Sequence, residues 1–106
     1  MAKYLYQANY TPTGMQGLLQ EGGSSRRKVF EEMGRDQGGQ LEAFYFAFGG
    51  ADLYIIFDLP DAATAAAISL AITAGGALSL STVQLLTPEE IDSAAQKTVN
   101  YRPPGA

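Results

Sequence analysis

Hydrophobic and polar positions change their spacing within the N-terminal part of the chain. Residues 3–10, KYLYQANY, are rich in tyrosine and typical of a β-strand, and Pro12 in the following TPTG breaks it. Apolar side chains then recur at steps of three and four, which predicts a helix. The positions that would share one helix face are Met15, Leu18, Leu19, Gly22, Arg26, Val29, Phe30 and Met33.

The glycine pair Gly22 and Gly23 interrupts this helical pattern. Glycine inside a helix costs roughly 1 kcal/mol relative to alanine, so two interpretations remain open. One long helix is kinked at the pair, or two shorter helices meet there, with Ser24 or Ser25 capping the second. In either case the glycines of DQGGQ end the helical region.

Two strands are expected next, LEAFYFAFGG and DLYIIFDL, joined by a short hairpin turn at Gly49, Gly50 and Ala51. Their side-chain rows are Leu41, Ala43, Tyr45 and Ala47 against Phe44, Phe46 and Phe48 in the first strand, and Leu53, Ile55, Phe57 and Leu59 against Tyr54 and Ile56 in the second. A sheet with one solvated face alternates between apolar and polar residues. These strands are apolar on both faces, so we expect something to cover the second face.

An alanine-rich segment, LPDAATAAAISLAITAGG, predicts the second long helix. Asp61 is a good N-cap for it, and Gly75 and Gly76 end it. The next residues, ALSLSTVQLL, predict the fourth strand.

The C-terminal part of the chain carries a strong local helix signal. Thr87, Pro88 and Glu90 stand at the N-cap, the first and the third helical positions, which is a capping box with the preferred proline. The final residues, VNYRPPGA, are expected to be extended, because the Pro103–Pro104 pair excludes a helix.

The predicted order is β-α-β-β-α-β with an additional C-terminal helix, which is the ferredoxin-like arrangement. We therefore expect an α+β fold in a single domain over residues 1–106, with both long helices on one face of a four-stranded antiparallel sheet. The other face would expose a larger apolar patch than soluble monomers usually carry. A second copy, giving a homodimer or higher homo-oligomer, would cover it. The alternative is that the C-terminal helix and tail of the same chain do so.

Composition narrows the possible chemistry. The chain of 106 residues has no cysteine and no histidine, which excludes disulfides, thiolate metal sites and Ser-His-Asp catalysis. No acidic cluster is evident, so neither a metal nor a cofactor is predicted. The net charge is −4 and the seven Lys and Arg form no basic stripe, so no nucleic-acid partner is expected. No signal-peptide pattern or membrane-length apolar run is visible, and we expect a cytoplasmic protein with no membrane partner.

Arg26 is the one charged residue at the centre of the predicted apolar stripe. Burying an unpaired guanidinium costs several kcal/mol, so it must find a carboxylate or reach water. One interpretation is an ion pair with Asp52, for which Glu42 and Asp58 are substitutes. A side chain that reaches solvent past Phe30 would serve equally well.

A pocket for an organic anion is the other interpretation of Arg26. The planar guanidinium groups of Arg26 and Arg27 suit a carboxylate or a phosphate. Tyrosines would form the walls, although tyrosine also suits core and interface packing. The predicted ligand-binding residues are Arg26, Arg27, Asp52, Tyr45 and Tyr54.

Four segments resemble the GYD domain family, namely YLYQANYTPTGMQGLL, EGGSSRRKVFEEMG, GGQLEAFYFAFGGADLYIIFDLPD and LLTPEEIDSAAQKTVNYRPPGA. The resemblance covers nearly the whole chain. At the Gly-Tyr-Asp triplet for which the family is named, this chain has Gly50, Ala51 and Asp52, so the tyrosine is replaced. The resemblance implies a ferredoxin-like, dimeric α+β barrel, and it implies no particular activity.

Three functions stay open at this point. The first is a homo-oligomeric protein that binds a small organic anion between the first helix and the sheet. The second is a cofactor-independent enzyme, an oxygenase or isomerase, which would use Tyr, Asp and Arg in a barrel cavity. The lack of histidine, the commonest proton shuttle near neutral pH, weighs against it. The third is a purely structural assembly unit, which internal pairing of Arg26 would favour.

Overall fold

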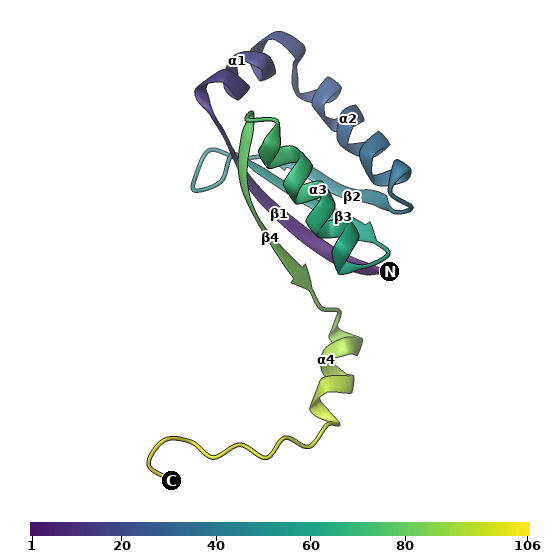
Figure 1. Cartoon of the computed structure of the whole chain (residues 1–106), viewed down its shortest axis with the longest axis vertical. Coiled ribbons are helices and arrows are strands. Elements are labelled where there is room, and N and C mark those ends of the chain that lie inside the picture. Colours follow the sequence, from purple (N-terminus) through teal and green to yellow (C-terminus); the bar gives the residue numbers. More distant parts are fainter.

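The computed structural model describes residues 1–106 and shows an α+β fold of the ferredoxin-like type (Figure 1). Its elements are β1 (Ala2–Tyr10), α1 (Pro12–Glu21), α2 (Gly23–Asp36), β2 (Gln40–Phe46), β3 (Leu53–Leu59), α3 (Ala62–Ala74), β4 (Leu78–Leu85) and α4 (Pro88–Ala95). The predicted fold class and element order are therefore confirmed, with the first helical region divided in two.

The four strands form one antiparallel sheet in the order β2-β3-β1-β4. Tyr6 of β1 lies opposite both Ile55 of β3 and Thr82 of β4, so these residues share a face. α2 packs over β2 and β3, and α3 over β3 and β4, on that same face (Figure 1). We call it the covered face, and we call the other, which includes Leu5, Ile56 and Val83, the open face.

The core lies between the covered face and the two long helices. Its buried residues are Tyr4, Tyr6, Ala8, Phe30, Leu53, Ile55, Phe57, Leu59, Ala65, Ile68 and Leu78. The rings of Tyr6 and Phe57 meet edge to face with centroids 5.7 Å apart. The Tyr6 hydroxyl donates a hydrogen bond to the Ala65 carbonyl at 2.6 Å, which ties α3 to the sheet. Burial raises the pKa of Tyr6 to about 12, so this donor keeps its proton at neutral pH.

The first helical region consists of two shorter helices, which resolves the choice that the sequence left open. Gly22 separates them with a φ of 85°, a left-handed conformation that favours glycine. Gly22 is also the N-cap of α2, so the predicted capping by Ser24 or Ser25 is wrong. Because the two axes differ, the predicted common face does not exist, and Leu19 and Val29 lie exposed.

The hairpin between β2 and β3 is longer than predicted. β2 ends at Phe46 and β3 begins at Leu53, with residues 47–52 between them. A bulge after Leu41 also changes the rows of β2, because it places Leu41 opposite Phe57 and Ala43 opposite Ile56. Leu41 therefore joins the covered face, and its predicted row with Ala43 is wrong.

The open face mixes apolar and charged side chains. Leu5 lies opposite Ile56 on one side and Val83 on the other, which makes an apolar band across three strands. Near one end of this band, Lys3 forms ion pairs with Asp58 at 2.9 Å and Glu42 at 3.0 Å. Tyr54 and Ile56 face away from the buried row of β3, as predicted.

α4 and the tail extend away from the sheet and lie over neither of its faces (Figure 1). α4 has the predicted capping box, in which the Glu90 amide donates to the Thr87 hydroxyl oxygen and the Thr87 amide donates to the Glu90 carboxylate. No residue of α4 is buried. The alternative in which this segment covers the open face of its own chain is therefore wrong.

Candidate functional site

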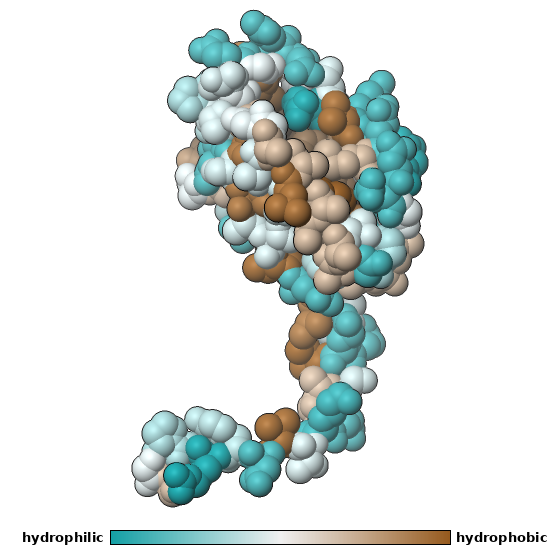
Figure 2. Space-filling view, in the orientation of Figure 1, coloured by the Kyte–Doolittle hydropathy of each residue, from teal (hydrophilic) through white to brown (hydrophobic).

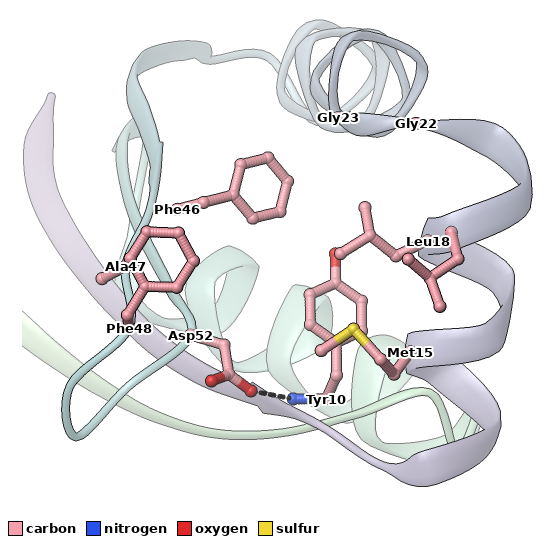
Figure 3. Close-up of a pocket in the computed structure, with 10 residues that line it drawn as sticks. Tyr10, Met15, Leu18, Gly22, Gly23, Phe46, Ala47, Phe48 and Asp52 are labelled. Carbon is pink, nitrogen blue, oxygen red and sulfur yellow. Dashed lines mark hydrogen bonds between the residues drawn. The ribbon is translucent and has the colours of Figure 1, made fainter.

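A cavity of about 640 Å³ lies between α1, the start of α2 and the connection from β2 to β3 (Figure 3). Its lining residues are Tyr10, Met15, Leu18, Leu19, Gly22, Gly23, Phe46, Ala47, Phe48 and Asp52. Met15 and Leu18 lie across the cavity from Phe46 and Phe48 in Figure 3. The wall is mostly apolar, and its polar side-chain atoms come from Tyr10 and Asp52.

The two glycines between α1 and α2 give the cavity its shape. Gly22 turns the chain, so that α1 stands apart from the sheet while α2 lies on it. Gly23 approaches Phe46 so closely that an added Cβ would lie 2.9 Å from the ring of Phe46. A larger residue at this position would therefore require the Phe46 ring, and with it the cavity wall, to shift.

Thr11 holds α1 in place on the other side. The Thr11 hydroxyl oxygen accepts a hydrogen bond from the Gly14 amide at 3.1 Å, which caps α1. The same hydroxyl donates to the Gly76 carbonyl at 2.9 Å, and the Thr11 amide donates to the Ala77 carbonyl at 3.0 Å. These bonds fix the start of α1 to the loop before β4, so the cavity has a defined rim.

Asp52 joins the ends of β1 and β3 at the base of the cavity. Its Oδ2 accepts a hydrogen bond from the Tyr10 amide at 2.9 Å, drawn in Figure 3. Its own amide donates to the Ala8 carbonyl at 2.9 Å. Oδ1 of Asp52 accepts no hydrogen bond from the protein, so it is open to a donor in the cavity.

The hydroxyl of Tyr10 is buried and has no hydrogen-bond partner. Burial is the main cause that raises the pKa of Tyr10, and the positive charge of Arg26 opposes the shift. The hydroxyl is therefore protonated at neutral pH and is a donor without an acceptor. A buried donor in this state costs about 1 to 3 kcal/mol, which a ligand with an acceptor atom would recover.

Arg26 lies beside Tyr10 with no carboxylate as a partner. Both ion pairs of the protein are made by Lys3, so the predicted Arg26–Asp52 ion pair is wrong, and Glu42 and Asp58 do not replace Asp52 in it. The guanidinium carbon of Arg26 instead lies 5.7 Å from the centroid of the Phe30 ring. This cation–π contact agrees with the predicted path past Phe30, and the guanidinium also approaches the Tyr10 hydroxyl.

The remaining predicted ligand-binding residues lie elsewhere. Arg27 is exposed and lines a shallow groove with Glu31 and Tyr45 at the β2 edge of the sheet. Tyr45 and Tyr54 are cross-strand neighbours on the open face. Of the five predicted residues, the structure therefore places only Asp52 in the cavity wall, and the other four lie outside it. Of these four, Arg26 lines a neighbouring pocket between α2 and α3 and approaches Tyr10 from there.

Sequence reasoning missed Tyr10 and the apolar wall. Tyr10 was one of several strand tyrosines, and only its place directly before the TPTG break distinguishes it. Phe46 and Phe48 were assigned to a strand row, and Met15 and Leu18 to a core stripe. The signal that points to them is the glycine pair, since a break there leaves the α1 residues of that stripe with no core to cover.

A family model described as GYD domain matches residues 4–95 of the chain. No curated protein and no solved structure gave a match. None of the helices combines the length and the apolar character that a membrane crossing requires. No group of three or more acidic side chains converges to hold a metal ion.

Proposed function

We infer that this chain, which belongs to the GYD domain family, binds a small organic acid with an apolar body in the cavity between α1 and the β2–β3 connection. One observation carries the inference. The buried Tyr10 hydroxyl lines an apolar cavity and donates no hydrogen bond to the protein, and the Arg26 guanidinium, which lines the neighbouring pocket under α3, approaches the same hydroxyl without a carboxylate partner.

The cavity has the size and character of a ligand site. Its volume of about 640 Å³ falls in the range of about 300 to 1,000 Å³ that is usual for small-molecule pockets. Such pockets are mostly apolar with a few polar groups that orient the ligand. Here Leu18 and Phe46 contribute to a wall for the apolar body, and Tyr10 provides the polar contact.

An acidic group fits the Tyr10 end of the cavity. A carboxylate accepts a hydrogen bond from the Tyr10 hydroxyl and from a guanidinium, and charged hydrogen bonds contribute roughly 1.5 to 3 kcal/mol. Asp52 stands at the opposite end of the Tyr10 side chain, beside the Tyr10 backbone. Its free oxygen suits a donor, such as a hydroxyl or an amine, on the far end of the ligand.

The experiment compares two ligands with the same body, 2-naphthoate and 2-naphthylmethanol, by calorimetric titration. We expect the acid to bind more tightly than the alcohol. Arg26→Met should weaken binding of the acid about tenfold, in line with the loss of one charged hydrogen bond. The affinity for the alcohol should stay unchanged. Arg27→Met is the matched control and should alter the binding of neither ligand, because Arg27 is exposed and does not approach the Tyr10 hydroxyl.

Two further variants test the same site. Tyr10→Phe removes the hydroxyl and should weaken binding of the acid by about three- to tenfold. Leu18→Trp fills the cavity and should abolish binding of both ligands. Equal affinity for acid and alcohol would refute the acid assignment, and binding that survives Leu18→Trp would refute the cavity itself. Recovery of naphthoate unchanged after incubation separates binding from turnover.

The same proposal includes a homodimer in which the open faces of two copies pack on each other. The band of Leu5, Ile56 and Val83 supports it, since no element of the chain covers these residues. Ile56→Asp places a charge within this band, directly beside Leu5, and should give a monomer at micromolar concentration by light scattering. Ala66→Asp, on the exposed side of α3, is the control and should leave the mass unchanged.

A further inference from the structure

The last segment of the chain, residues 86–106, is a separate arm. Its apolar side chains are exposed, namely Leu86, Ile91, Val99 and Tyr101. Figure 2 shows hydrophobic patches along this arm, well away from the main body of the molecule. The core and the side chains packed against it lie between Ala2 and Leu80, so the arm contributes nothing to them.

The arm is structured by its own signals, yet these signals are insufficient in water. The capping box at Thr87 and Glu90 defines where α4 begins. Isolated helices shorter than about 12 to 15 residues are only marginally stable, and α4 has 8 residues. A partner surface that covers Ile91 would therefore stabilise α4.

The arm does not fold back on its own chain, for a local reason. Thr87 precedes Pro88, which restricts it to extended backbone, and it has φ −75° and ψ 159°. No residue between Leu78 and Pro104 has a positive φ, so the backbone makes no left-handed turn in this segment. The arm continues away from the end of β4 (Figure 1).

The exposed area of the chain is larger than a compact monomer should have. The accessible surface is 7080 Å² for a chain of 11.3 kDa, whereas folded monomers of this mass expose about 5,700 Å². The excess of about 1,400 Å² exceeds the roughly 800 Å² that each partner buries in a standard interface. The excess accessible surface is therefore large enough to form an interface with a second copy.

We propose that the arm of each copy docks on the other copy, with the Ile91 face of α4 and the side chains of Val99 and Tyr101 against the partner. The exchange is reciprocal, as two-fold symmetry requires. This proposal rests on the homodimer proposed above and adds that the arm, and not the open face alone, holds the two copies together.

The experiment uses the full chain, the variant Ile91→Asp and its control Ser93→Asp, which adds the same charge on the opposite side of α4. Sedimentation velocity over a concentration series gives the dimer dissociation constant. We expect Ile91→Asp to raise it at least tenfold and Ser93→Asp to change it less than twofold. A chain ending at Leu86 retains the whole core, and its dimer dissociation constant should rise at least as much as that of Ile91→Asp.

Amide hydrogen exchange supplies a readout that is independent of affinity. The α4 amides should be protected in the dimer and should lose protection on dilution to the monomer. If the dimer persists in both Ile91→Asp and the truncated chain, arm docking is overturned, whereas the open-face dimer remains consistent with the result. A full-length chain that is monomeric at high concentration would overturn both. Protection of α4 in the monomer would show that the arm docks on its own chain, which also overturns the exchange.

Discussion

The two faces of one sheet differ in how their side chains are used. On the covered face, Leu53, Ile55 and Phe57 of β3 are fully buried beneath the helices. On the open face, Tyr54 and Ile56 alternate with them and have no helix above them. Adjacent residues of the same strand thus serve different purposes. The covered row holds the helices on the sheet, whereas the open row leaves apolar area that, in the homodimer proposed above, meets the second copy.

Paired substitutions on β3 test this difference most strongly. Phe57→Ala removes a buried ring that packs against Tyr6 and should lower the free energy of unfolding by about 3 to 5 kcal/mol. Ile56→Ala, on the open face, should cost about 1 kcal/mol in the dilute monomer. Urea unfolding at low protein concentration measures both. Equal losses would mean that the two faces are equally important to the fold.

Alkaline pH should weaken the covered face selectively. The pKa of Tyr6 is about 12 in the folded protein against about 10 in an unfolded chain. The folded state therefore keeps this proton longer, so stability is complete below pH 10 and is lost as the pH rises towards 12. At about 1.4 kcal/mol per pKa unit the loss is at most about 3 kcal/mol.

Tyr6→Phe provides the check on that expectation. The variant lacks the hydroxyl and its bond to Ala65, so it should be less stable at pH 8 but should lose less stability between pH 10 and pH 12. Urea titrations at these pH values measure it. An alkaline loss of the same size in both proteins would assign the effect to another tyrosine.

The smallest effect is expected from the ion pairs of the open face. The Lys3 hydrogen bond is the main cause that lowers the pKa of Asp58, so the stabilisation is present above the unfolded pKa near 4 and is lost on acidification. Lys3→Met should lower the urea midpoint slightly at pH 7 and have no effect at pH 2. A difference in urea midpoint that persists at pH 2 would show that the aliphatic part of the Lys3 side chain stabilises the protein by packing.

Much of the fold follows from local signals in the sequence. Asp61 caps α3, Thr87 and Glu90 cap α4, and Gly75 ends α3, all as predicted. These signals act between residues close in the chain, so a pattern reveals them. The bulge after Leu41 was not predictable in this way, because it depends on how β2 meets β3 across space.

The candidate site was predicted less well, for a related reason. Arg26 was correctly singled out as an unusual residue, but its expected partner required two distant side chains to meet, and they do not. Strict alternation along β3 already places Tyr54 on the other face of the sheet from the buried Leu53. The sequence could therefore have predicted that Tyr54 lies outside the cavity. The direction of α1 after Gly22 was not, and it decides that Met15 and Leu18 line a cavity.

The separation of core and arm has an evolutionary consequence. Because no residue that belongs to the core or packs against it follows Leu80, we expect substitutions in the last residues to leave the domain intact. The match to the family also ends at residue 95, so the final segment lies outside the shared pattern. In the arm exchange proposed above, substitutions in this tail would change which chains recognise each other without changing the fold of either one.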